Sequence, residues 1–133
     1  MKIKNKLSIL GFHSVNLVLI IFYLYPGSIF GCYLYNNCYI QPQITSNFMI
    51  SSNYWISSNH FYAFIFLSTL GFCAYQNKKQ IKLLVKYLFF LSTILELSHT
   101  LIPMRGFEWG DLFGNILGVI LVVIIYNIKN RYA

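Results

Sequence analysis

Charged side chains are scarce in this sequence. Only 10% of the 133 residues are charged and just three of them are acidic, whereas 57% are hydrophobic. A soluble domain of this size needs far more charge to cover its surface, and a disordered chain would not be so apolar. The composition and the mean hydropathy of +0.59 therefore predict a membrane protein. Its main partner is the lipid bilayer, and it has no room for a separate soluble domain.

The sequence also lacks a contiguous basic face, although its formal net charge is +7. Nucleic-acid-binding proteins need such a face as a minimum. The lysines here flank hydrophobic runs instead, which is a signal of membrane topology. We therefore expect no nucleic-acid partner.

Metal-ligand spacings such as Cys-x-x-Cys are absent as well. Cys73 lies in an apolar stretch and is expected to be a small buried residue. Cys32 and Cys38 share one loop, and both a disulfide and two unpaired thiols remain open, because a sequence does not supply the geometry that a bridge requires. No metal and no cofactor are expected.

Four apolar stretches have the length to cross a bilayer core, which takes about 20 helical residues. The second stretch is the shortest and can borrow residues from Tyr54–Ser58. The last two are joined by one tight segment, Pro103–Gly110, and must be antiparallel neighbours. We predict an all-α, integral membrane four-helix bundle that forms a single domain, residues 1–133. The predicted spans cover about 7–25, 58–76, 83–102 and 111–128.

The basic residues orient this bundle. Nine of the ten lie before the first span, between the second and third or just inside the third, or after the fourth, and only Arg105 lies on the other side. The positive-inside rule makes the basic side cytoplasmic, so both termini are expected inside. A cleaved signal peptide, with a lipoprotein-like box at Ile29–Cys32, is the alternative. It is disfavoured because the first apolar run, at about 19 residues, exceeds the length of a signal core.

The first external loop, from Pro26 to about Asn59, contains no charged residue and is rich in aromatic residues, Ser and Asn. Tyr and Trp favour the headgroup level of a bilayer, so the loop is expected to lie on the membrane interface. Two interpretations remain open for it: a plain interfacial belt, and an aromatic surface that binds a lipid or glycan headgroup.

All three acidic residues fall between positions 96 and 111. Glu96 is expected roughly 9 Å below the external end of the third span, and a carboxylate at that depth indicates a functional site by default. Asp111 starts the fourth span, where it can also cap the free N–H groups of the helix. The candidate functional cluster comprises Glu96, His99, Arg105, Asp111, Asn115 and His60.

Two features of this region bear on how the spans pack. Gly110, Gly114 and Gly118 form a small-xxx-small ladder, which is typical of closely packed membrane helices. Arg105 is expected to reach the carboxylates of the cluster. The cluster is then either a buried ion-pair network that fixes the third and fourth spans, or a charged pocket open to the outside. In the second case Arg105 binds a phosphate or a carboxylate.

The segment Arg105–Gly118 resembles the signature of the VanZ-like family of small bacterial membrane proteins. The family pattern R-x-F-x-x-x-D-x-x-x-N-x-x-G is matched here by Arg105, Phe107, Asp111, Asn115 and Gly118. The four-span arrangement is similar too. The resemblance implies a multi-pass protein of the bacterial cytoplasmic (inner) membrane.

Two further segments carry the resemblance, with departures. His60–Phe64 resembles the H-F-x-A-F segment of the family, but Ile56-Ser57 replaces the usual Asp-Lys pair ahead of the histidine. Glu96 stands where the family has E-x-x-Q, with His99 in place of the glutamine. The family is named for a protein linked to resistance to the glycopeptide antibiotic teicoplanin, so the resemblance implies a role in the cell envelope and not a defined reaction.

Three functions fit these observations. The expected one is an envelope protein whose outward-facing polar site binds a lipid headgroup or a lipid-linked cell-wall precursor. The first alternative is a membrane enzyme acting on a lipid-linked or phosphorylated envelope substrate. In it, Glu96 or Asp111 would be the base, His99 the proton shuttle and Arg105 the charge stabiliser. The second alternative is a structural subunit of an oligomer or a larger membrane complex.

Overall fold

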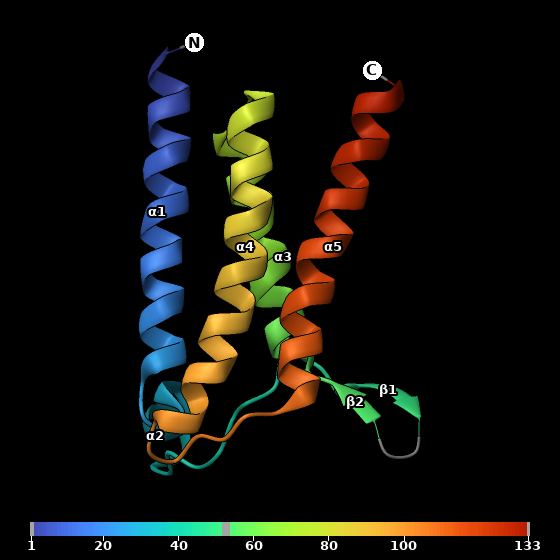
Figure 1. Cartoon of the computed structure of the whole chain (residues 1–133). Coiled ribbons are helices and arrows are strands. Elements are labelled where there is room, and N and C mark those ends of the chain that lie inside the picture. Colours follow the sequence, from blue (N-terminus) through green and yellow to red (C-terminus); the bar gives the residue numbers. More distant parts are fainter. Residues whose placement is uncertain (1, 52–53, 133) are drawn as a thin grey trace.

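The computed structural model describes residues 2–51 and 54–132; Met1, residues 52–53 and Ala133 lie outside the described residues. The described part is mostly helical, as predicted, and four long helices run along one another (Figure 1). The predicted spans correspond to these helices in order. Their bounds are α1 (Lys2–Leu24), α3 (Ser58–Ala74), α4 (Lys78–Ser98) and α5 (Trp109–Tyr132).

Local chemistry sets the ends of these helices. The side chain of Asn77 accepts a hydrogen bond from the backbone N–H of Lys79 at 2.9 Å, which satisfies one of the free donors of the first turn. The helix α4 therefore begins at Lys78 and not at about residue 83. At its other end α4 tightens into a 3₁₀ turn, η1 (His99–Leu101), before Pro103.

Two helices in the described part of the chain are long and apolar enough to cross a membrane: Lys6–Leu24 within α1, and α5. The helix α3 has 17 residues, and α4 carries Lys82 and Lys86 within its first half. The two apolar helices support the assignment to a membrane protein. Four spans remain a prediction from the sequence.

The loop between α1 and α3, predicted to be external, contains regular structure that the sequence pattern did not predict. It forms a short helix, α2 (Ile29–Tyr35), and an antiparallel hairpin of β1 (Phe48–Ser51) and β2 (Tyr54–Ile56). The Ser28 side chain caps α2 by accepting from the backbone N–H of Gly31 at 3.0 Å. Asn36, in the left-handed conformation at φ 49°, ends the helix. A mostly helical fold therefore includes one small sheet.

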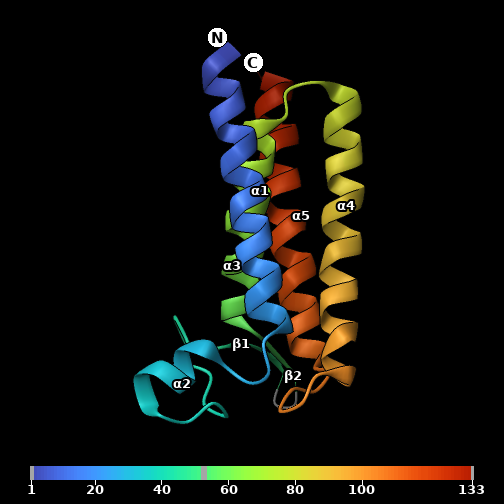
Figure 2. The ribbon, with the colours of Figure 1, turned by 90° about the vertical axis from the view of Figure 1, so that its left-hand side faces the viewer.

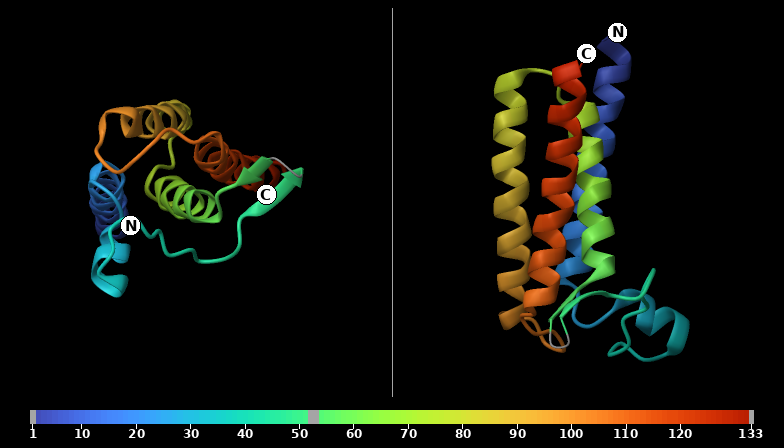
Figure 3. Two further views of the ribbon diagram at one scale, coloured as in Figure 1. Left: turned by 90° about the horizontal axis from the view of Figure 1, so that it is seen from below. Right: turned by 90° about the vertical axis from the view of Figure 1, so that its right-hand side faces the viewer.

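The two ends of the bundle differ in character. Both chain termini and the α3–α4 connection lie at one end (Figures 1 and 2). The helix α2, the hairpin and the α4–α5 connection lie at the opposite end, which we call the loop end. Seen from that end, α3 lies between α1 and α5, with α4 alongside (Figure 3). Phe64 and Leu67 of α3 are accordingly completely buried in the core.

The glycine ladder packs against the segment that includes β2 and α3. A Cβ atom added at Gly114 would lie 2.7 Å from the carbonyl oxygen of Ser57, and one added at Gly118 would lie 2.6 Å from that of Phe61. At Gly110 the neighbour is the carbonyl of Trp55 in β2, at 2.5 Å. The absent side chains thus allow α5 to lie directly on the backbone of β2 and α3.

Candidate functional site

Three helix ends meet at the loop end of the bundle, and each contributes a titratable side chain. His60 lies in the first turn of α3, Glu96 in the last turn of α4, and Asp111 in the first turn of α5. His99 follows in η1, and its side chain is buried like the other three. Residues far apart in the sequence therefore converge on one buried cluster, which we call the inner cluster: His60, Glu96, His99 and Asp111.

Short distances connect the members of the inner cluster. Oε2 of Glu96 lies 3.3 Å from Nδ1 of His99 and 3.9 Å from Nδ1 of His60. Nε2 of His60 lies 3.3 Å from Oδ2 of Asp111. The other carboxylate oxygen of Glu96, Oε1, accepts a hydrogen bond from the backbone N–H of Glu108 at 2.9 Å. Two carboxylates and two imidazoles are thus packed against one another in the protein interior.

Tyr23 of α1 completes this arrangement, and the sequence reasoning missed it. Its hydroxyl donates to Oδ1 of Asn115 at 2.6 Å and lies 3.1 Å from Nδ1 of His60. Its backbone carbonyl lies 3.1 Å from Nε2 of His99, and the two rings stack with centroids 5.7 Å apart. A tyrosine near the end of an apolar span is typical of an interfacial belt, so nothing in the local pattern indicated this role.

Asn115, a member of the candidate functional cluster, is fully buried. Its side-chain amide donates to the backbone carbonyl of Ser92 in α4 at 3.4 Å, while its oxygen accepts from Tyr23. The side-chain amide of Asn115, on α5, is therefore held between α4 and α1. This network leaves the nitrogen and oxygen of Asn115 with different partners, which fixes the orientation of the amide.

Arg105 has partners that differ from the predicted ones. Its Nη2 group donates to the carbonyl of Phe22 at 3.1 Å and its Nε group to that of Tyr25 at 3.4 Å. Within the described residues it makes no ion pair with a carboxylate. Carbonyls at a helix C-terminus lack partners within the helix and carry a partial negative charge, which explains the contact. Desolvation lowers the pKa of Arg105 from its ordinary value, and Asp111 and Glu96 act in the opposite direction.

A cavity of about 250 Å³ opens beside the inner cluster. The end of α1, the segment with α2, the loop before the hairpin and the start of α3 form its walls. His60 and Arg105 belong to this wall, together with mostly apolar and aromatic neighbours. The cavity therefore combines a cation and an imidazole with a hydrophobic lining. Its other residues include Phe22, Ile29, Phe30, Pro42, Asn59 and Ala63.

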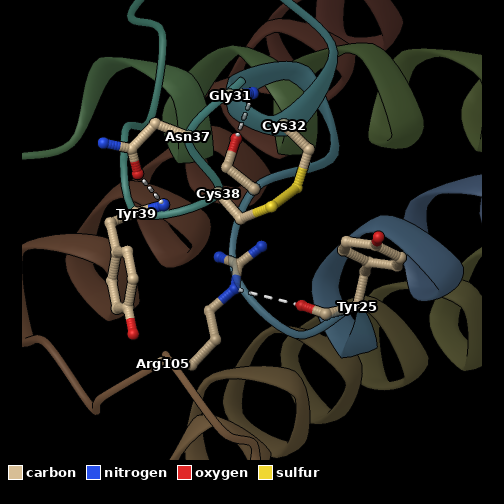
Figure 4. Close-up of a disulfide and its surroundings, with 8 residues drawn as sticks. Tyr25, Gly31, Cys32, Asn37, Cys38, Tyr39 and Arg105 are labelled. Atoms are coloured by element: carbon tan, nitrogen blue, oxygen red, sulfur yellow. Dashed lines mark hydrogen bonds between the residues drawn. A yellow bond between two sulfur atoms is a disulfide. The ribbon is translucent and has the colours of Figure 1, made fainter. Parts of the chain in front are cut away.

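A disulfide closes the loop that carries α2. It joins Cys32 and Cys38, which resolves the two alternatives left open by the sequence in favour of the bridge. Figure 4 shows the Arg105 guanidinium between Tyr25 and the bridged loop. Cys73, expected to be buried, is exposed on the surface of α3, because that face of the helix lies outside the core.

The chain matches no protein-family model, no curated protein and no solved structure. The resemblance to the VanZ-like family therefore remains a prediction from the motif residues. The residues of that motif lie in two places in the structure: Asp111 and Asn115 belong to the buried network, and Arg105 lies in the cavity wall.

Proposed function

We propose that this chain is a VanZ-like, four-span protein of the bacterial cytoplasmic membrane whose external cavity binds an anionic headgroup. The ligand is the phosphate of a membrane lipid or of a lipid-linked cell-wall precursor. The observation that carries the proposal is the position of Arg105. Its guanidinium is anchored by the carbonyls of Phe22 and Tyr25 in the wall of an otherwise mostly apolar cavity.

The chemistry of this cavity fits a phosphate ester with a hydrocarbon chain. A guanidinium group has five N–H donors in a planar fork that matches phosphate and carboxylate oxygens. Two carbonyls occupy part of that fork, and its remaining donors have no bonded partner among the described residues. The nearby side chains of Phe22 and Phe30, which contact each other edge-to-face with ring centroids 5.3 Å apart, offer an apolar surface to the start of a chain.

Three further observations support the proposed membrane arrangement. Large apolar side chains are exposed on the outer faces of the long helices, where lipid would cover them. The described basic residues other than Arg105 lie in the first turns of α1, the first half of α4 and the last turn of α5. These are the parts of the helices nearer the end opposite to the loop end (Figure 1), which agrees with the positive-inside rule. The disulfide lies at the loop end, and disulfides persist outside the reducing cytosol. Exposed apolar residues include Leu10, Leu17, Leu83, Phe90 and Ile125.

The test is binding of fluorescent lipids to the full-length protein in phosphatidylcholine nanodiscs. The two probes are a polyprenyl phosphate and a phosphatidylglycerol, and inorganic phosphate serves as a competitor. A charged hydrogen bond contributes about 1.5–3 kcal/mol, so Arg105→Ala should weaken binding of the preferred probe by about 10- to 100-fold. Arg131→Ala, which removes the other arginine at the opposite end, is the matched control.

The two probes distinguish the two sources of the phosphate group. Tighter binding of the polyprenyl phosphate identifies a precursor carrier, and tighter binding of phosphatidylglycerol identifies a bulk lipid. Competition by free phosphate at similar concentration would show that the lipid chain contributes little. The proposal fails if Arg105→Ala and Arg131→Ala both bind the two probes as the unaltered protein does.

A further inference from the structure

The two histidines of the inner cluster each use one ring nitrogen to contact Tyr23. Nε2 of His99 faces the backbone carbonyl of Tyr23 at 3.1 Å. A carbonyl oxygen only accepts hydrogen bonds, so this nitrogen carries the hydrogen. In the neutral ring, Nδ1 then presents a lone pair, and it points at Oε2 of Glu96 from 3.3 Å.

The same logic applies to His60. The single hydroxyl hydrogen of Tyr23 is donated to Oδ1 of Asn115 at 2.6 Å. The Tyr23 oxygen must therefore accept from Nδ1 of His60, 3.1 Å away. This leaves the lone pair of Nε2 facing Oδ2 of Asp111 at 3.3 Å. Both imidazoles thus direct an acceptor at a carboxylate, which is itself an acceptor.

Such an arrangement is unfavourable unless a positive charge lies between the groups. Oε2 of Glu96 is completely buried, and its nearest polar neighbours among the described residues are Nδ1 of His99 at 3.3 Å and Nδ1 of His60 at 3.9 Å, neither in the geometry of an ordinary hydrogen bond. An unpaired buried carboxylate oxygen loses its hydration without compensation. The geometry therefore favours a shared cation: either protons or a metal ion.

The distances favour a metal ion over protons. Charge-assisted hydrogen bonds are about 2.7–2.9 Å long, whereas the two nitrogens that carry a lone pair each lie 3.3 Å from a carboxylate oxygen. Two ligand atoms that each lie about 2.1 Å from a tetrahedral ion are about 3.4 Å apart. His60, Glu96 and Asp111 each offer one ligand atom, and the three atoms lie within 4.8 Å of one another.

The surroundings of His60 also match those of a metal ligand. A metal-bound histidine donates its second ring N–H to a carbonyl, a carboxylate or a similar acceptor, which fixes its tautomer. Tyr23 supplies such an acceptor to His99 through its carbonyl and to His60 through its hydroxyl. One residue of α1 thereby orients both rings.

We propose that His60, Glu96 and Asp111 bind a divalent first-row transition-metal ion. A set of one imidazole and two carboxylates suits Zn²⁺ and its neighbours better than Mg²⁺ or Ca²⁺, which prefer oxygen ligands alone. The ligands come from the ends of three different helices, α3, α4 and α5. For this reason no short spacing of ligand residues in the sequence predicts the site. This inference goes beyond headgroup binding and does not depend on it.

Cobalt is a suitable probe, because Co²⁺ replaces Zn²⁺ in such sites and has visible absorption bands. The full-length protein in detergent, treated with a chelator and then dialysed, should bind one Co²⁺ per chain. Zn²⁺ should displace the ion, and Mg²⁺ and Ca²⁺ should not. Glu96→Gln and Asp111→Asn should each weaken Co²⁺ binding by at least about tenfold. His13→Gln, which alters a histidine bonded to Tyr75 instead, should bind Co²⁺ as the unaltered protein does.

A second variant tests metal ligation directly, because its readout is a new spectroscopic band and not a loss of Co²⁺ binding. His60→Cys, in a Cys73→Ser background, places a thiolate at the site and should produce a sulfur-to-cobalt charge-transfer band. Arg105→Ala should retain full Co²⁺ affinity, which separates this test from that of headgroup binding. The proposal is overturned if the unaltered protein binds no Co²⁺, or if Glu96→Gln binds it equally well and the charge-transfer band is missing.

Discussion

Oε1 of Glu96 accepts a hydrogen bond from the backbone N–H of Glu108, twelve positions later, at 2.9 Å. The carbonyl of Glu108 in turn accepts from the backbone N–H groups of Asp111 and Leu112, both at 3.1 Å, where α5 starts. One buried carboxylate therefore fixes the connection between α4 and α5 as well as belonging to the inner cluster.

Glu96→Ala should lower the free energy of unfolding by about 1–3 kcal/mol, because it leaves the N–H of Glu108 without an acceptor. Glu96→Gln keeps an oxygen at the same place and should lose less. Denaturant titration in detergent, followed by circular dichroism, measures both. Equal stability of the two variants would show that the bond to Glu108 contributes nothing. The comparison also separates this bond from metal binding, which both substitutions are expected to weaken.

The glycine ladder gives a second prediction. A Cβ at position 114 would lie 2.7 Å from the carbonyl oxygen of Ser57, and backbone cannot move aside as a flexible side chain can. Gly114→Ala should therefore destabilise the protein by about 1–3 kcal/mol through overpacking. Gly11→Ala is the matched control, since an added Cβ there meets nothing within 4 Å. Thermal unfolding of the two variants measures the difference, and a Gly114→Ala protein as stable as Gly11→Ala would contradict the close approach.

The bridge between Cys32 and Cys38 predicts a defined labelling pattern. The sequence holds three cysteines, and Cys73 is the free one among the described residues. Unfolded protein treated with N-ethylmaleimide should gain one label without a reductant and three after reduction. Intact mass spectrometry counts the labels. Three labels on unreduced protein isolated from membranes would show that the loop is not bridged.

Glu108, outside the long helices, predicts a pH dependence. Partial desolvation raises the pKa of its carboxyl group above the ordinary value of 4.5, and the charges of Asp111 and Glu96 raise it further. A carboxyl group with a raised pKa in the folded state contributes stability below its unfolded pKa, and that contribution is lost as the pH rises through the folded value. Stability should therefore fall with increasing pH above about 4.5. Glu108→Gln should reduce this fall, and unfolding curves measured between pH 4 and 7 would reveal it.

The long helices could be predicted because each carries its own signal. A run of about 20 apolar residues indicates a helix wherever it lies, and Pro26 and Pro103 mark ends that local sterics impose. The helix α2 and the hairpin carry no such signal, since neither has the length or the regular alternation that distinguishes helix from strand. Their formation depends on contacts such as the Ser28 cap and the bridged loop.

The site was predictable only where the residue type is unusual for its place. Glu96 and His99 stand out on an apolar helix, and both lie in the inner cluster. Tyr23 does not stand out, because tyrosine is common at the end of a span. The partners of Arg105 are backbone carbonyls, which every residue possesses, so no sequence pattern could identify them.

The length of α3 has a consequence for the surrounding lipid. Its 17 residues extend about 25 Å, which is less than the roughly 30 Å of bilayer hydrocarbon. The hairpin ahead of it has unpaired strand edges and cannot enter the hydrocarbon to make up the difference. In the proposed arrangement this hydrophobic mismatch is relieved by a thinner bilayer around α3, by snorkelling of flanking side chains or by association with another chain. His60, in the first turn, would then lie at headgroup depth, where ions and phosphate groups from outside can reach it.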